Sequence, residues 1–206
     1  MSDINITEST VALIDSLKST TAEFGLAGTG SEYKIVIEIF LYKFFNDKFG
    51  YEAKKDKVYG ERLRRAEKWD AEYDTFTDEE VEDLFSYLPS SVPRLKPEHT
   101  LAHLYNATGK GDFSTLLDAT LIDIAKINSD TFSVSTSGKS RVNIFSAVTS
   151  YVTDTQKRDE FAKSLMRKVA SFNFEDVFTE KYDFFSRLFE HLLQGFNNAG
   201  GGKYAE

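Results

Sequence analysis

The chain has 206 residues and a formal net charge of −8, and 41% of its residues are hydrophobic. A chain of this length can bury a large core, and the absence of cysteine excludes disulfides and thiolate metal ligands. The acidic balance argues against uniform, nonspecific binding to a nucleic-acid backbone. The first ten residues lack a secretory signal pattern, and the longest apolar run is too short to span a bilayer. We therefore expect a cytoplasmic protein without a membrane segment.

The first fifty residues show helical periodicity. Apolar residues at spacings of three and four predict a helix over residues 7–24, ended by a group of glycines. A second helix is expected over residues 32–48, with Ser31 as its N-cap and Gly50 as its stop. Because this second helix is apolar on nearly all sides, we expect it to lie at the centre of the fold.

The middle of the chain predicts further helices. Thr77 and Glu80 have the spacing of a capping box, in which each side chain accepts from the other residue's backbone N–H. Pro97 suits the first turn of a helix, since its missing N–H would be unpaired there in any case. The expected helices cover residues 57–73, a segment starting at 77, and residues 97–107 and 113–127.

The periodicity then changes. Residues 131–135 and 141–144 alternate with period two around a turn at residues 137–140, which predicts a β-hairpin. Helical patterns resume over residues 146–152, 154–170 and 182–196. We therefore expect a mainly α protein, an irregular multi-helix bundle with one small β-hairpin near residues 131–144.

Residues with catalytic or metal-binding chemistry are sparse. His99 and His103 share one helix face, but two histidines do not form a metal site, and we expect them to be solvated. No segment has the local signature of a catalytic triad or of a glycine loop between a strand and a helix. We therefore expect no metal site and no catalytic residue in this chain.

Charge is strongly segregated along the chain. Residues 54–68 include seven basic and three acidic side chains, whereas residues 70–83 include eight acidic and no basic ones. Such runs are commonly solvated faces of helices. On this interpretation the positive charge of the basic run and the negative charge of the acidic run compensate each other. The basic run could instead contact DNA phosphates or an acidic partner surface.

Two segments resemble a known family. The first is Ser31-Glu32-Tyr33-Lys34, followed by the apolar run 35–45 and by Asn46-Asp47-Lys48-Phe49. The second is the aromatic-rich segment from Tyr182-Asp183, followed by a glycine cluster and Lys203-Tyr204-Ala205-Glu206. Together they resemble the modification subunits of type I restriction–modification systems, which are adenine-specific DNA methyltransferases.

The resemblance implies a domain organisation. Residues 1–196 would be a helical N-terminal domain, and residues 197–206 a linker into an absent methyltransferase domain. In the full-length protein S-adenosylmethionine would be the cofactor, with Glu206 near its pocket. The partners would be a specificity subunit, a second modification subunit and double-stranded DNA held by the assembled complex. The chain lacks the family's Asn/Asp-Pro-Pro-aromatic motif and its glycine-rich cofactor loop, so it cannot transfer a methyl group by itself.

Within that organisation the helical domain would help to assemble the complex and to enclose DNA. The residues expected to contact DNA are basic, and the last two lie on the predicted hairpin: Lys54, Lys55, Lys57, Arg62, Arg64, Arg65, Lys139 and Arg141. The alternative is a non-enzymatic helical adaptor with a purely protein partner, which the net acidity of the chain favours.

Overall fold

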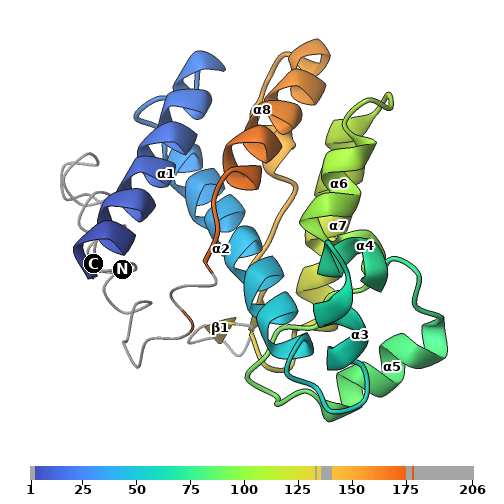
Figure 1. Cartoon of the computed structure of the whole chain (residues 1–206). Coiled ribbons are helices and arrows are strands. Elements are labelled where there is room, and N and C mark those ends of the chain that lie inside the picture. The colour runs from blue at the N-terminus through green and yellow to red at the C-terminus, as the bar shows by residue number, and fades with distance from the viewer. Residues whose placement is uncertain (1–2, 133, 136–140, 175–177, 179–206) are drawn as a thin grey trace.

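The chain folds into a multi-helix bundle, as expected. The computed structural model describes residues 3–132, 134–135, 141–174 and 178. The longer helices lie side by side, and shorter helices from residues 60–87 gather around the C-terminal end of the helix over residues 30–53 (Figure 1). The α-helices are α1 (Asp3–Glu23), α2 (Gly30–Ala53), α3 (Gly60–Arg65), α4 (Trp69–Tyr73), α5 (Asp78–Tyr87), α6 (Leu101–Ala107), α7 (Phe113–Ile127) and α8 (Arg158–Ala170).

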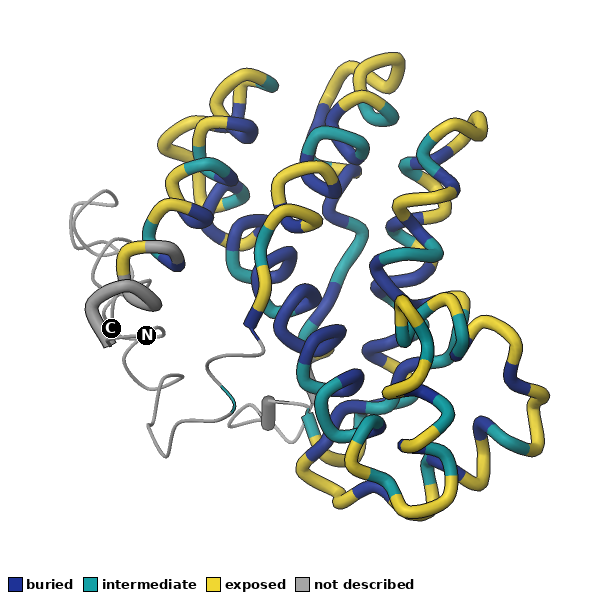
Figure 2. The backbone as a smooth tube through the Cα atoms, in the orientation of Figure 1, coloured by how far each residue is buried: buried dark blue, intermediate teal, exposed yellow. Residues whose placement is uncertain are grey.

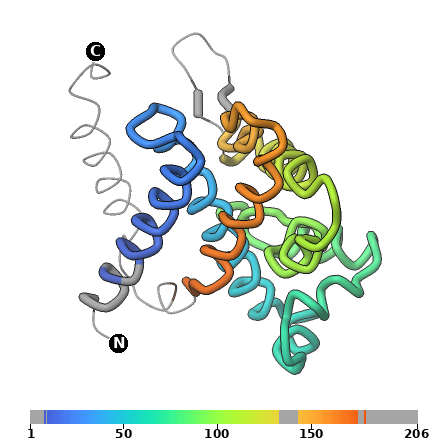
Figure 3. The backbone as a smooth tube through the Cα atoms, turned by 90° about the horizontal axis from the view of Figure 1, so that it is seen from above, coloured from blue at the N-terminus to red at the C-terminus, as the bar shows by residue number. Residues whose placement is uncertain are grey.

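The helix α2 lies at the centre, which confirms the expectation from its all-round apolar sequence. Its side chains Ile35, Tyr42 and Phe49 are fully buried, and buried positions follow α2 and the inward faces of its neighbours (Figure 2). Helix α8 lies between α1 and the α6–α7 pair and contacts all of them as well as α2 (Figure 3). Since β-branched and aromatic residues are only moderate helix formers, packing rather than propensity stabilises α2.

A tight connection joins α1 to α2. Gly25 and Gly28 have φ angles of 80° and 69°, which non-glycine residues seldom adopt. Helix α2 begins earlier than predicted, and its N-cap is Thr29 rather than Ser31: the Thr29 hydroxyl accepts from the backbone N–H of Glu32. Thr29 takes the cap because its extended backbone, with ψ of 156°, points its hydroxyl at the first turn.

The prediction that Gly50 ends α2 is wrong, because the helix continues to Ala53. Phe49 and Ala53 are both fully buried, so packing on either side maintains the helix through the glycine. A Cβ atom at Gly50 would lie 2.5 Å from the indole ring of Trp69. The glycine therefore provides close approach for this ring rather than a break in the helix.

The helix expected over residues 57–73 is two short helices, α3 and α4, separated at residues 66–68. Residues 64–68 contain no buried side chain, so packing against the core does not stabilise a continuous helix there. Leu63 and Tyr73, one on each short helix, are buried. Similarly, the segment expected over 97–107 splits into a 3₁₀ turn η1 (Pro97–His99) and α6, which Thr100 caps.

Other boundaries agree well with the sequence. Helix α7 has the predicted bounds, and the capping box of Thr77 and Glu80 at the start of α5 is confirmed. The segment expected over 146–152 is the 3₁₀ turn η2 (Val148–Tyr151), and that expected over 154–170 is η3 (Thr155–Lys157) followed by α8.

The expected β-hairpin is reduced to a minimal pairing. Two residues of β1 (Val134–Ser135) pair antiparallel with two of β2 (Arg141–Val142). This pairing is too short to establish a hairpin, and the turn expected at residues 137–140 lies outside the described residues. The helix expected over 182–196 and the linker 197–206 also lie outside them.

Candidate nucleic-acid interface

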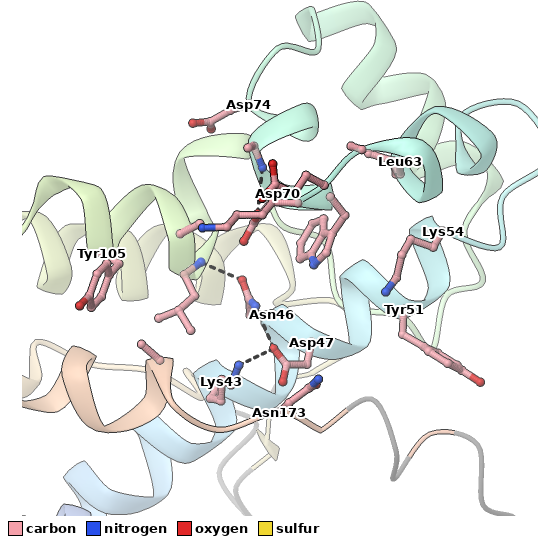
Figure 4. Close-up of a pocket in the computed structure, with 18 of the residues that line it drawn as sticks. Lys43, Asn46, Asp47, Tyr51, Lys54, Leu63, Asp70, Asp74, Tyr105 and Asn173 are labelled. Carbon is pink, nitrogen blue, oxygen red and sulfur yellow. Dashed lines mark hydrogen bonds and ion pairs between the residues drawn. The ribbon is translucent and has the colours of Figure 1, made fainter.

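A groove of about 1290 Å³ opens between α2, the α3–α4 pair, α6 and the end of α8. Figure 4 shows lining side chains that come from all these parts of the chain. Six basic and four acidic side chains line the groove, so its lining is net positive on a protein of net charge −8. The basic ones are Lys43, Lys54, Lys55, Arg64, Lys68 and Arg167.

The floor of the groove is a buried polar cluster on α2. Lys43 Nζ lies 2.8 Å from Asp47 Oδ1, and both side chains are only 7% exposed. Asn46 also donates to Asp47 Oδ1, at 3.0 Å, and its own carbonyl accepts from the backbone N–H of Leu101 at 2.8 Å (Figure 4). Asp47 Oδ2 accepts from the backbone N–H of Phe174 at 2.9 Å. The cluster therefore joins α2, the start of α6 and the segment that follows α8.

The structure brings three of the predicted DNA-binding residues to the groove: Lys54, Lys55 and Arg64. Lys55 lies 3.7 Å from the centre of the Tyr51 ring and 3.3 Å from Glu52, yet its side chain remains half exposed. Arg64 donates to the backbone carbonyl of Lys54, which closes the loop between α2 and α3.

Two other predicted residues, Lys57 and Arg65, are exposed and do not line the groove. Arg65 pairs with Glu61 one turn earlier on α3, whereas Lys57 makes no ion pair within the described part of the chain. Exposed pairs of this kind are weak, so both cations can still meet an anionic partner.

Arg62, by contrast, is used inside the protein. Its guanidinium donates to Glu72, to Glu80 at 2.9 Å and to Thr75 at 2.7 Å. It also lies 4.4 Å from the centre of the Phe76 ring. This arrangement connects α3 with α4 and α5, and it pairs one residue of the basic run with two of the acidic run. The structure thus gives Arg62 a stabilising role, and its predicted contact with DNA stays a prediction.

The remaining predicted residues cannot be placed in the groove. Arg141 is described only as a backbone position in β2, and Lys139 and Glu206 lie outside the described residues. The described residues also contain no strand that leads through a glycine turn into a helix, the arrangement that holds nucleotide-type cofactors.

Aromatic side chains are the part of the groove that no sequence pattern indicated. Tyr51, Trp69, Tyr105 and Phe172 line the groove together with the basic residues. They come from four segments that are distant in sequence, so no local pattern unites them. The one available signal was the glycine at position 50 within an apolar helix, which the structure explains by the indole of Trp69.

The expectation that both histidines are solvated is wrong for His99, which is 2% exposed. Its Nε2 lies 3.0 Å from Asp123, and its Nδ1 accepts from the backbone N–H of Lys96. Burial lowers the pKa of His99, so the ring is neutral near pH 7. His103 faces Asp74 across the surface at 3.1 Å. Within the described ranges, no three His, Cys, Asp or Glu side chains gather as a metal site would require.

Two carboxylates, buried Glu38 and half-buried Asp118, hold the segment around η2 against the bundle. Glu38 accepts hydrogen bonds from the backbone N–H of Ser146, at 2.7 Å, and from the Ser146 hydroxyl. Asp118 likewise accepts from the backbone N–H and from the hydroxyl of Thr149. Burial raises the pKa of each carboxyl, partly offset by these hydrogen bonds. Their role is to accept hydrogen bonds from backbone N–H groups of the segment around η2, and neither carboxylate lines the groove.

The residues that carry the family resemblance also have structural roles. Glu32 accepts from the backbone N–H of Gly28 at 2.6 Å and from the hydroxyl of Thr21, which fixes the α1–α2 connection. Asp47 organises the floor of the groove, and Phe49 is fully buried against Tyr73. The similar residues therefore coincide with positions on which the geometry of α2 depends.

No family model matches the sequence, and comparisons with curated proteins and with solved structures give no match. Across the described residues, no helix has both the length and the apolar character that crossing a membrane requires.

Proposed function

We propose that this chain is the N-terminal helical domain of the modification subunit of a type I restriction–modification system, which acts in the cytoplasm. Its role is to assemble with a specificity subunit and a second modification subunit and to help enclose double-stranded DNA. The methyl transfer from S-adenosylmethionine to adenine belongs to the full-length protein. The chain itself supplies positive charge and a rigid helical frame.

One observation carries the DNA-contacting part of the proposal. Lys55, Lys57 and Arg65 lie on the α2–α3 connection and on α3, and their side chains are exposed. Lys55 lines the groove, and we call these three residues the rim. The protein as a whole is acidic, so a polyanion is attracted to this local concentration of positive charge and not to the surface in general. Lysine and arginine that neutralise phosphates in this way provide affinity without reading sequence.

The first test concerns DNA. Duplex binding by the chain, measured by fluorescence anisotropy at low salt, should weaken about tenfold or more when Lys55 and Arg65 are both changed to Glu. A matched control changes Lys110 and Lys126 to Glu, since both are exposed and lie away from the groove. Equal losses in the two double variants would show that only net charge matters and would overturn the assignment of this rim.

The second test concerns the enzyme. The coding sequence beyond Glu206 should continue with Tyr-Thr-Pro and, further on, with an Asn-Pro-Pro-aromatic motif that holds the flipped adenine. The protein that includes this sequence should transfer a methyl group to adenine in duplex DNA. A downstream sequence without these motifs would contradict the methyltransferase assignment.

A second function, a helical adaptor for a protein partner, is favoured by the surface of α5. Asp78, Glu79, Glu82 and Asp83 are exposed on this helix, and Tyr87 at its end is 52% exposed. Such a surface suits a basic protein partner. Failure of both tests above, together with salt-sensitive binding of a basic protein that charge reversal on α5 abolishes, would establish this function instead.

A further inference from the structure

The groove combines cations with aromatic rings, and the duplex-contacting role does not require rings to lie there. Trp69, the chain's single tryptophan, lines the groove at the start of α4 and is partly exposed. Its indole is seated on the backbone of α2 at Gly50, where any side chain would collide with it. This contact, together with the neighbouring rings of Phe49 and Tyr73, holds the indole in a fixed place, as a stacking platform requires.

Tyr105 provides a second ring that lines the groove, from α6 rather than α4. It projects from α6 and is 46% exposed (Figure 4). Its ring stacks on no other aromatic ring or cation among the described residues. A large aromatic side chain left this open on a helix could have been replaced by a polar residue without loss to the core. Its apolar surface is therefore available to a ligand.

The cations are placed to accompany these rings. Lys68 precedes Trp69 directly and is exposed, without an ion pair in the described part of the chain. Arg64 lines the same groove from α3. Bases that stack on aromatic rings while phosphates meet nearby cations are the general mode by which proteins hold single strands.

From these observations we propose that the groove binds an unpaired stretch of nucleic acid, with bases stacked on Trp69 and Tyr105 and phosphates near Arg64 and Lys68. The site goes beyond the proposed contact with duplex DNA, which concerns the rim. At about 1290 Å³ the groove exceeds the usual 300–1,000 Å³ or so of a small-molecule pocket. Its size suits an extended ligand of several linked units.

An acidic peptide is the competing occupant, because it would also be attracted by the basic side chains. An acidic peptide would not need two aromatic rings in the groove, because its carboxylates lie on flexible side chains. In nucleic acid, by contrast, the charged phosphates lie next to flat bases that can stack on such rings. Four acidic residues, Asp47, Glu67, Asp70 and Asp74, also line the groove, so charge alone gives a modest attraction. Stacking therefore has to supply much of the affinity, which favours nucleic acid.

The single tryptophan makes the proposal directly measurable. Intrinsic fluorescence of the full chain is followed at low salt during titration with oligothymidylate, which cannot pair with itself. A hairpin-free duplex and polyglutamate are titrated in parallel. The expected result is saturable quenching by oligothymidylate, with weaker affinity for the duplex and no quenching by polyglutamate. Quenching by polyglutamate alone, or by no probe, would overturn the proposal.

Variants separate stacking from charge. Tyr105→Ala should weaken oligothymidylate binding about tenfold, equivalent to about 1.4 kcal/mol and within the range known for base stacking. Tyr87→Ala is the matched control, because Tyr87 is similarly exposed but lies on α5 outside the groove. Both positions are exposed, and thermal unfolding checks that each variant is folded. Equal affinities for the two variants would contradict the stacking role of Tyr105.

The variants distinguish the contact of the rim with duplex DNA from the binding of a single strand in the groove. Changing Lys57 and Arg65, which are exposed and do not line the groove, to Glu should weaken duplex binding more than oligothymidylate binding, whereas Tyr105→Ala should do the reverse. Failure of duplex binding with intact quenching by oligothymidylate would remove the rim assignment and leave the groove assignment in place.

Discussion

The carboxylate of Asp47 accepts a hydrogen bond of 2.9 Å from the backbone N–H of Phe174, which lies 127 residues later in the chain. Its other oxygen accepts from Lys43 and Asn46. One side chain thus fixes the direction in which the chain leaves α8 relative to the centre of the bundle. Because Asp47, Asn46 and Lys43 also form the floor of the groove, the shape of the groove depends on this connection.

Replacing Asp47 with Ala should destabilise the protein by about 3–5 kcal/mol. The change leaves the buried ammonium of Lys43 without its partner, and an uncompensated buried charge is costly. Urea unfolding followed by circular dichroism measures the loss. The double variant Lys43→Met, Asp47→Leu is the control, since removing both charges should restore much of the stability. A double variant as unstable as Asp47→Ala would contradict the view that the orphaned charge is the main cost.

Replacing Gly50 with Ala tests how firmly Trp69 is seated. In a helix interior this change normally stabilises by about 1 kcal/mol. Here the new Cβ would lie 2.5 Å from the indole, and we expect a net destabilisation of about 1–3 kcal/mol through overpacking. The tryptophan emission maximum should shift as the ring moves. A stabilised variant with unchanged emission would show that the ring does not rest on α2.

Replacing Arg62 with Ala should cost about 2 kcal/mol of unfolding free energy, because the variant cannot form the charged hydrogen bonds to Glu72 and Glu80. Arg65→Ala, on the same short helix, should change stability by less than about 0.5 kcal/mol, since its pair with Glu61 is exposed. Thermal or urea unfolding of the two variants measures the difference. Equal effects would refute the role of Arg62 in holding α3, α4 and α5 together.

The pH dependence of stability should reflect Glu38. Burial raises its pKa above the ordinary 4.5, so its contribution to stability is present below that value and is lost as pH rises through the folded pKa. The nearby charges act in opposite directions: Lys34 lowers the pKa, and Asp118 raises it. Glu38→Gln should therefore gain stability relative to the unmodified protein between about pH 4 and pH 7. A relative loss over that range would contradict the direction of this shift.

Asp159 provides a control of opposite sign. Hydrogen bonds from Ser114 lower its pKa below the ordinary 3.8, so its contribution to stability is present above that value and is lost as pH falls. The cost of Asp159→Asn should consequently be largest near neutral pH and should shrink in acid. The same trend for both variants would mean that a global effect, rather than these two sites, governs the profile.

The sequence predicted best those parts of the fold that local chemistry determines. The bounds of α7 follow from its amphipathic period, and the start of α5 follows from the capping box of Thr77 and Glu80. The central position of α2 follows from a helix that is apolar on every side. In each case the deciding interactions lie within a few residues of one another, so a single segment contains the whole signal.

Features that depend on distant contacts were not predictable. Gly50 was expected to end α2, but Trp69 and the buried neighbours of the glycine decide otherwise. The internal use of Arg62 depends on acidic residues up to eighteen positions away. The groove itself gathers Tyr51, Trp69 and Tyr105 from separate helices, so only the basic half of the candidate site was visible as a sequence pattern.

The salt dependence of duplex DNA binding shows most clearly whether the basic rim binds phosphates. We predict that changing Lys55, Lys57 and Arg65 together to Ala flattens the slope of log affinity against log salt by about 1 for each phosphate that is no longer neutralised. Changing the exposed Lys110, Lys126 and Lys157 to Ala should leave the slope unchanged. Identical slopes for the unmodified protein and both triple variants would contradict the assignment of this rim to DNA.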